Sequence, residues 1–209
     1  MNKDTIIMGL TGGIGTGKST ASEYLKSKGF VHIDADAISR SITADGSPVL
    51  DTLNKVFGPD GEMGVEGHNI IDESGSLMRQ ALADIVFVDS AKTKRLDEIM
   101  LSQIISIIDD KVKRYRESCD MCRVLLDAPL LFESGLDSRC DKVMVIVADK
   151  DTRISRVEMR DGISAKQIQE RIDNQMDDVE KVSKADYVID NSGALGELYE
   201  QLDKIVKKL

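Results

Sequence analysis

Residues 12–19 read Gly12-Gly13-Ile14-Gly15-Thr16-Gly17-Lys18-Ser19, which fits the Walker A pattern of a glycine, four residues and then Gly-Lys-Ser. The apolar run 6–10 comes directly before this motif and predicts a buried strand, and residues 19–25 after it predict a helix. Strand, loop and helix in this order are the context that the motif requires. The chain is therefore predicted to bind a nucleoside triphosphate.

Each part of the motif has a chemical task in such a loop. Glycines permit positive φ, so that backbone N–H groups can close around phosphate oxygens, and the positive end of the following helix dipole points at the same oxygens. Lys18 is expected to reach the β- and γ-phosphates, and the Ser19 hydroxyl is expected to bind Mg²⁺. The residues predicted to hold ATP here are Gly12, Gly13, Ile14, Gly15, Thr16, Gly17, Lys18, Ser19 and Thr20.

Composition and charge indicate which partners and which compartment to expect for this protein. The formal net charge of −9 repels nucleic acid and anionic membranes, so neither is expected as a partner. We find no signal peptide before the first strand and no apolar run of membrane-spanning length, which predicts a soluble, cytoplasmic protein. The odd number of cysteines, three, favours free thiols in a reducing compartment. These are Cys119, Cys122 and Cys140.

Five short apolar segments, rich in branched side chains, are typical of strands buried in a parallel sheet. They are Ile6–Leu10, Phe30–Ile33, Val124–Leu126, Lys142–Val147 and Tyr187–Ile189. Enough chain separates each from the next for a helical crossover, which predicts a doubly wound α/β fold with a five-stranded parallel sheet. Ligands of such sheets bind at the carboxyl ends of the strands, where the Walker A motif falls.

Two connections are too long to be single crossovers. The first, roughly 37–122, has helical patterns at 49–57, 77–87 and 96–112 around a glycine-rich turn region, and predicts a helical insertion. The second, 149–181, is strongly polar and predicts a mobile helical lid. The segment 194–209 predicts a closing amphipathic helix. The side chains expected to face inward from it are Leu195, Leu198, Leu202, Ile205 and Val206.

Two carboxylates, Asp34 and Asp36, end the second predicted strand, so we expect them at the same edge of the sheet as the Walker A motif. A carboxylate there can accept a proton from an attacking hydroxyl or hold Mg²⁺. Arg40 lies four residues after Asp36, on the same helical face, and could bind a substrate anion. The alternative for this pair is a helix cap with a surface salt bridge.

Asp127 ends the third predicted strand, in the position of a Walker B carboxylate that holds Mg²⁺ or its water shell. In the second long connection, Arg153, Arg156 and Arg160 are three and four residues apart and share one helical face. Arginines so placed can stabilise a transferring phosphoryl group. The alternatives are a solvated aspartate at a strand end and a surface helix held by salt bridges.

Taken together, these motifs and their order resemble the dephospho-coenzyme A kinase family nearly from end to end. The matching pieces are residues 10–20, Asp34-Ala35-Asp36, Arg40, Gly46-Ser47-Pro48, Arg79, Leu82, Val86-Phe87, Pro129-Leu130-Leu131-Phe132-Glu133, Arg156, Arg160-Asp161-Gly162, Arg171, Gln175 and 185–191. The resemblance implies ATP-dependent phosphorylation of the ribose 3′-hydroxyl of dephospho-coenzyme A, the last step of coenzyme A synthesis.

The resemblance also implies a division of the chain and of its residues. The nucleotide-binding core of a P-loop kinase would comprise 1–36, 120–148 and 182–209, with a coenzyme A domain at 37–119 and a lid at 149–181. Asp36 would be the catalytic base, with Asp34 as the fallback, and Lys18, Arg156 and Arg160 would assist the transfer. Asn191 would help to hold ATP. The residues assigned to the acceptor are Thr11, Asp36, Arg40, Arg79, Pro129, Leu130 and Leu131.

The sequence departs from the family pattern in the helical insertion. Leu101-Ser102 stands where His-Pro is usual, Met78 stands where Asp often precedes the matched arginine, and Asp89-Ser90 replaces Asp-Pro. These departures concern acceptor binding and keep the first of two rival hypotheses open, whereas the intact Lys18, Ser19, Asp36 and Asp127 disfavour the second. One is another kinase of this fold acting on a nucleoside or sugar, and the other is a nucleotide-dependent regulator without catalysis.

Overall fold

The structure is a computed structural model that describes residues 5–118 and 122–209. It divides into two compact units. One comprises Met1–Asp34 and Lys111–Leu209, and the other comprises Ala35–Asp110. We call the first the sheet unit and the second the helical unit. The segment 149–181 lies within the residue ranges of the sheet unit.

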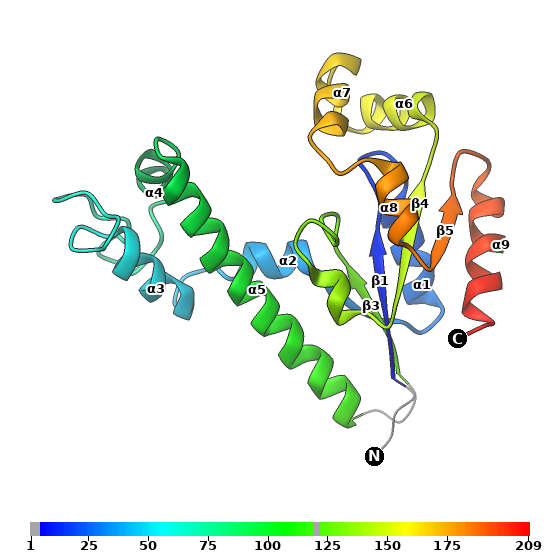
Figure 1. Ribbon diagram of the computed structural model, residues 1–209, viewed down its shortest axis with the longest axis horizontal. Coiled ribbons are helices and arrows are strands. Elements are labelled where there is room, and N and C mark those ends of the chain that lie inside the picture. Colours follow the sequence, from blue (N-terminus) through cyan, green and yellow to red (C-terminus); the bar gives the residue numbers. More distant parts are fainter. Residues whose placement is uncertain (1–4, 119–121) are drawn as a thin grey trace. The chain divides into compact units, whose positions relative to one another are not determined.

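The sheet unit is built on a five-stranded parallel sheet, which confirms the predicted fold class (Figure 1). The strands follow the spatial order β2-β3-β1-β4-β5, so β1, which leads into the Walker A motif, is central. Their bounds are β1 Ile6–Thr11, β2 Val31–Asp34, β3 Arg123–Asp127, β4 Lys142–Val147 and β5 Tyr187–Asp190. The second strand was predicted to begin at Phe30, but Phe30 precedes β2 and packs into the core.

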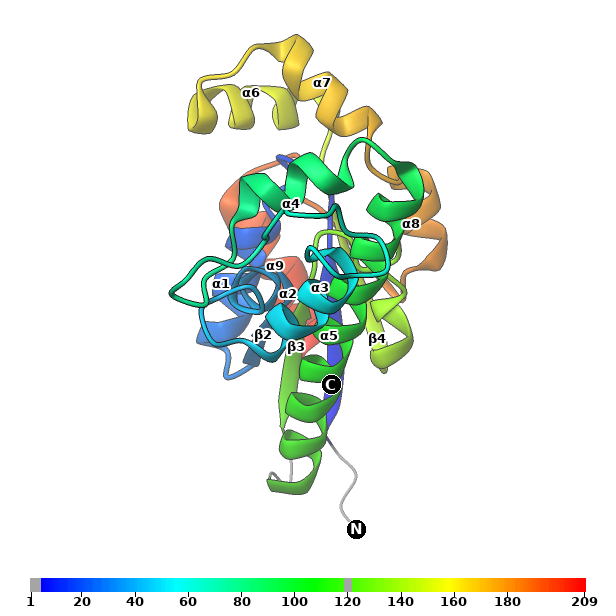
Figure 2. The ribbon, with the colours of Figure 1, turned by 90° about the vertical axis from the view of Figure 1, so that its left-hand side faces the viewer.

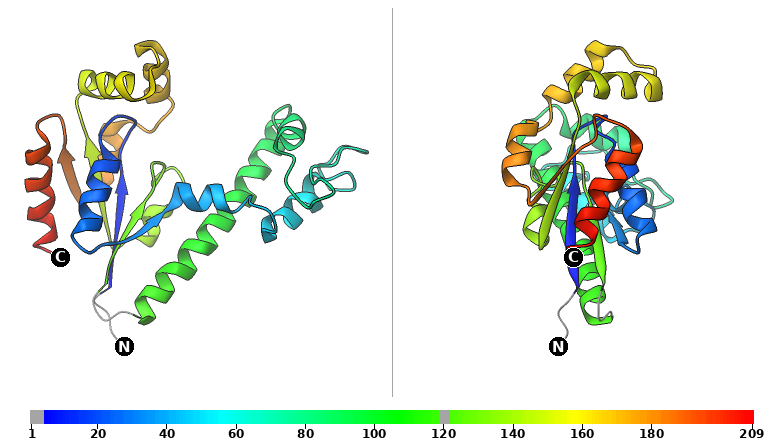
Figure 3. Two further views of the ribbon diagram at one scale, coloured as in Figure 1. Left: turned by 180° about the vertical axis from the view of Figure 1, so that it is seen from behind. Right: turned by 90° about the vertical axis from the view of Figure 1, so that its right-hand side faces the viewer.

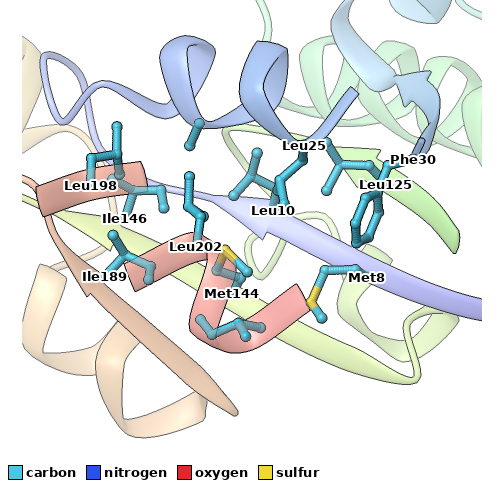
Figure 4. Close-up of a cluster of buried hydrophobic side chains, with 12 residues drawn as sticks. Met8, Leu10, Leu25, Phe30, Leu125, Met144, Ile146, Ile189, Leu198 and Leu202 are labelled. Atoms are coloured by element: carbon cyan, nitrogen blue, oxygen red, sulfur yellow. The ribbon is translucent and has the colours of Figure 1, made fainter. Parts of the chain in front are cut away.

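Helices cover both faces of this sheet (Figures 2 and 3). On one face lie α1 (Lys18–Ser27) and α9 (Leu195–Val206), and on the other lie α8 (Asp178–Lys184) and a 3₁₀ turn at Leu136–Arg139. Figure 4 shows the core under α1 and α9, where Leu198 and Leu202 of α9 pack with strand residues such as Met144. The expectation for Leu195 is wrong: it is 53% exposed, because it opens α9 beyond the contact with the sheet.

Two further helices of the sheet unit, α6 (Lys150–Asp161) and α7 (Ala165–Asp173), lie beyond the carboxyl ends of the strands (Figure 1). Local sequence sets their limits. The Asp149 carboxylate caps α6 by accepting from the Thr152 N–H at 2.8 Å, and Gly162 ends it at φ 65°. Ser164 and Gln167 form a capping box at the start of α7.

The helical unit contains α2 (Ala35–Ser41), α3 (Pro48–Phe57), α4 (Arg79–Val86) and the first part of α5 (Ser90–Ser118). Pro48 opens α3 at the position where a missing N–H costs nothing. Apolar side chains at helical spacing form the core of this unit. They are Val49, Leu50, Leu53, Val56, Phe57, Leu82, Ile85, Val86 and Ile99, joined by Ile70 from the intervening loop. The helical pattern predicted at 96–112 is part of the longer α5.

Among the described residues, no helix combines the length and the apolar character needed to cross a membrane. Cys140 is a free thiol, as expected, and burial together with nearby Asp137 and Asp141 raises its pKa to about 12. Cys122 is disulfide-bonded, so the expectation of a free thiol there is wrong. Cys119 lies outside the described residues.

Candidate active site

The Walker A motif forms a loop between β1 and α1, and residues 12–17 are called the phosphate loop below. Gly17 sits at φ 89° immediately before α1, a conformation that favours glycine. A Cβ at Gly17 would collide with the amide of Asn191, whose Nδ2 donates to the Thr16 carbonyl oxygen at 2.8 Å. Within the loop, Thr16 Oγ1 donates to the Gly13 carbonyl oxygen at 2.9 Å. Asn191 therefore contacts the backbone of the phosphate loop.

Lys18, the first residue of α1, forms an ion pair with Asp127 at the end of β3. Both side chains are largely shielded from solvent, with 16% and 9% of their surfaces exposed. The two elements meet because β1 and β3 are neighbours, with Leu10 in register with Asp127. The structure thus joins the Walker A lysine to the aspartate predicted as its Walker B partner.

The second oxygen of Asp127 contacts a residue that the sequence analysis did not assign to the site. His32 Nε2 lies 3.2 Å from Asp127 Oδ2 and 3.2 Å from the Ser22 hydroxyl of α1. His32 precedes Asp34 by two residues in β2, so both side chains point to the same face of the sheet. The two-residue spacing of His32 and Asp34 could have indicated in the sequence that His32 lies near the site. It identifies Asp127 as the partner of His32 only once β2 is known to pair with β3.

The two aspartates after the second strand separate in the structure. Asp34 is the last residue of β2 and is in register with Asp127 of β3, so their side chains share a face of the sheet. Asp36 lies in the first turn of α2, in the helical unit, and is exposed. Arg40 is exposed in the last turn of the same helix.

The arginines of α6 and α7 have different surroundings. Arg160 makes two contacts with Asp161, at 2.7 and 2.8 Å, which lower the pKa of the Asp161 carboxyl. Arg171 Nη1 approaches the same carboxylate at 3.9 Å. Arg156 has a buried Nη1 without a hydrogen-bond partner among the described residues, 3.8 Å from where a Cβ of Gly17 would stand. Arg156 therefore brings an unsatisfied donor to the phosphate loop.

The loop after β3 lies beside the end of β1. The Thr11 hydroxyl donates to the Pro129 carbonyl oxygen at 3.0 Å, and Thr11 itself is buried. Leu130 is 52% exposed, whereas Leu131 is fully buried. In this structure Leu131 can therefore affect a bound acceptor only by shaping the loop.

Ser19 and Thr20, the residues after Lys18, are exposed in the first turn of α1. Ser19 thus brings a hydroxyl to the positive end of this helix dipole, beside the phosphate loop. Within residues 5–118 and 122–209, no group of three or more His, Cys, Asp and Glu side chains is placed to hold a metal ion.

The helical unit contains a cavity of about 170 Å³ with mostly apolar walls. Its polar groups are Arg79 and Thr43, joined by a hydrogen bond of 2.8 Å from Arg79 Nη2 to Thr43 Oγ1. The apolar lining consists of Leu53, Leu77, Leu82, Ala83, Phe87, Leu96 and Met100. Such a cavity suits an apolar ligand group that carries a polar or anionic end.

Comparison with known proteins points to one family. The model of the dephospho-CoA kinase family matches residues 6–197. A dephospho-CoA kinase of Corynebacterium glutamicum is 38% identical over 204 residues, covering 97% of this chain and 98% of the relative. The structure of TT1252 from Thermus thermophilus superimposes with a TM-score of 0.75 at 30% identity, covering 99% of each chain.

A dephospho-CoA kinase from Campylobacter jejuni has a similar structure, with a TM-score of 0.68 at 26% identity over 97% of this chain and 96% of that one. The family match covers most of the chain and includes the phosphate loop, Asp127 and the whole helical unit. We conclude that the chain belongs to the dephospho-CoA kinase family.

Proposed function

We propose that this protein transfers the γ-phosphoryl group of ATP to the ribose 3′-hydroxyl of dephospho-CoA, giving CoA and ADP. The observation that carries the proposal is the Lys18–Asp127 pair at the phosphate loop, within a chain of the dephospho-CoA kinase family. Phosphoryl transfer needs positioned cations and little covalent chemistry from the protein. A shielded lysine at the mouth of a glycine-rich loop supplies such a cation.

The phosphates of ATP would bind to the N–H groups of the phosphate loop and of the first turn of α1. Lys18, which in this structure contacts Asp127, would then reach the β- and γ-phosphates. The available donors fit Mg²⁺, a cation that prefers oxygen: the hydroxyl of Ser19 and the carboxylate of Asp127, with Asp34 beside it in register. Bound there, Mg²⁺ would neutralise phosphate charge.

The acceptor hydroxyl must lose a proton as it attacks phosphorus. We assign to Asp36 the role of the base that accepts this proton, because its carboxylate is exposed in the first turn of α2. Asp34 is the alternative base, although its register with Asp127 favours a role near the metal ion. Arg40, four residues after Asp36 on α2, would bind an anionic group of the acceptor.

We assign charge stabilisation in the transition state to Arg156 and Arg160 of α6. The buried, unpartnered Nη1 of Arg156 near Gly17 supports its role, because a phosphate oxygen would satisfy that donor. Arg160 would have to exchange its contacts with Asp161 for contacts with the nucleotide. Segment 149–181 would then act as a lid over the phosphates.

The helical unit is our candidate for the acceptor domain, predicted at 37–119. Its apolar cavity would hold the pantetheine arm of dephospho-CoA, and Arg79 at the cavity would bind an anionic group of the same substrate. In the sheet unit, exposed Leu130 would contact the acceptor, whereas buried Thr11 and Leu131 would shape the loop around Pro129. The cytoplasmic location and the lack of nucleic-acid and membrane partners stay predictions.

The test is a steady-state assay with dephospho-CoA, compared with a panel of nucleosides and sugars at saturating ATP and Mg²⁺. We expect the highest kcat/KM with dephospho-CoA, and a product that carries the new phosphate on the ribose 3′-oxygen. A higher kcat/KM for a nucleoside or sugar would identify a different kinase. Tight ATP binding without turnover of any acceptor would favour the non-catalytic regulator.

A further inference from the structure

The backbone of Ile14, in the middle of the phosphate loop, is held on both sides by side chains from segment 149–181. The Ile14 N–H donates to Gln175 Oε1 at 2.9 Å, and the Ile14 carbonyl oxygen accepts from Arg153 Nε at 2.8 Å. Both polar groups of one loop residue are thus satisfied by residues more than 130 positions away. A glycine-rich loop has little conformational preference of its own, so such contacts decide its shape.

Arg153 is committed to protein contacts. It is 5% exposed, and besides Ile14 it contacts Asp178 of α8 through Nη1 at 2.6 Å. One guanidinium therefore joins the phosphate loop, α6 and α8. A lysine ammonium has no planar fork with which to meet a carbonyl and a carboxylate in this arrangement. The place for the guanidinium exists because Gly13 has no side chain, since a Cβ there would collide with Arg153 Nη2.

Arg156, one turn further along α6, differs in this respect. Within the part of the chain that the structure describes, its buried Nη1 has no hydrogen-bond partner, whereas the Arg153 guanidinium is paired with a carboxylate and a carbonyl. The sequence places both arginines on one basic face of a helix, but in the structure their guanidinium groups have different surroundings. Arg156 retains a donor for a phosphate oxygen, and Arg153 acts on the loop itself.

We propose that Arg153, Gln175 and Asp178 are positioning residues that hold the phosphate loop in its ATP-binding shape before ATP arrives. We call these three side chains with the Ile14 backbone the Ile14 clamp. Ordering the loop is then accomplished during folding, so that less entropy is lost when the nucleotide binds. The inference rests on the proposed binding of ATP to this loop, and it requires the clamp to be closed with and without nucleotide.

The first test needs no variant. Amide hydrogen exchange of Ile14 is measured by NMR in the nucleotide-free protein and with ADP. We expect slow exchange in both, because this N–H donates to Gln175 Oε1, a bond that needs no atom of the nucleotide. Exchange at the rate of an unprotected amide in the nucleotide-free protein, or protection that arises only with ADP, would overturn the proposal.

The second test uses variants and measures ADP affinity by calorimetry alongside steady-state kinetics. Gln175→Leu removes the acceptor and should weaken ADP binding about tenfold and raise the KM for ATP similarly. Gln175→Glu keeps an acceptor oxygen and should restore most of this loss. Arg153→Lys keeps the charge but loses the fork, and should resemble Gln175→Leu. At saturating ATP, kcat and the KM of the acceptor should change less than threefold.

Lys166→Gln is the control, because Lys166 is exposed on α7 in the same segment and is not part of the Ile14 clamp. It should bind ADP as wild type does. Folded Gln175→Leu and Arg153→Lys proteins with wild-type ADP affinity would refute the clamp. A further outcome is that the Gln175 and Arg153 variants weaken ADP binding although the wild type does not phosphorylate dephospho-CoA. In that case the proposed substrate is wrong and the proposal of the Ile14 clamp is retained.

Discussion

Replacing Asp127 with asparagine tests the centre of the proposed site. The Asp127 side chain is 9% exposed, and its carboxylate contacts Lys18 with one oxygen and His32 with the other. Hydrogen bonds to charged groups contribute about 1.5–3 kcal/mol each, and an asparagine amide can replace only one acceptor oxygen without charge. We therefore expect Asp127→Asn to lower the free energy of unfolding by about 2 kcal/mol in the absence of ligands.

The assay has two readouts. A loss of about 2 kcal/mol corresponds to a fall in Tm of roughly 4–8 °C for a chain of this size. If Asp127 also holds Mg²⁺ or its water shell, the Mg²⁺ concentration for half-maximal activity should rise about 10–100-fold. Asp60→Asn, an exposed carboxylate in a loop of the helical unit, is the control and should change neither value.

The two readouts separate the possible failures. A lower Tm with wild-type Mg²⁺ dependence would mean that Asp127 positions Lys18 without serving the metal ion. Wild-type values for both would refute the reasoning, because the shielded ion pair and the contact with His32 would then contribute nothing measurable.

Of four further predictions, three concern residues of the site and one concerns the thiol of Cys140. Asp36→Asn should lower kcat by about 10²–10⁴ with nearly unchanged ATP affinity, and a crippled Asp34→Asn beside an active Asp36→Asn would transfer the role of base to Asp34. Lys18→Ala should cost roughly 3–4 kcal/mol of transition-state stabilisation while circular dichroism shows a retained fold; near wild-type kcat would refute this role. Arg79→Ala should raise the KM for dephospho-CoA about tenfold and leave the KM for ATP unchanged, unless the cavity is unrelated to the acceptor. Cys140, whose thiol pKa is raised to about 12, should stay protonated at pH 8.5 and react with iodoacetamide far more slowly in the folded than in the unfolded protein, as peptide mass spectrometry would record.

Much of the sheet unit could be predicted from local patterns. Strands β1, β3 and β4 are short, apolar and largely buried, so their residues indicate a strand without knowledge of any partner. The phosphate loop is equally local, because Gly17 and Lys18 derive their roles from backbone freedom and charge next to a helix start. The wrong expectations concern ends of elements: Phe30 is buried but precedes β2, and Leu195 opens α9 but is exposed.

The residues that bind the acceptor were predicted from the resemblance to a family, because residue patterns alone do not identify them. Nothing in the spacing of Arg79 identifies it as a cavity residue, since its partner Thr43 lies 36 positions away across α3 and its loops. The two aspartates after β2 are a similar case. Their spacing permits either residue as base, and the helix that begins at Ala35 is what places Asp34 in the sheet and Asp36 on a helix.

Local sequence was sufficient for features whose atoms are neighbours in the chain: the buried strands, the glycine-rich loop, the helix caps and the ligand class. Long-range packing was required for the features that join them. His32 meets Asp127 across 95 positions, and Ile14 meets Arg153 and Gln175 across 139 and 161. The physical reason is that a hydrogen bond needs its two groups within about 3 Å, a condition that folding creates and residue spacing over such lengths does not encode.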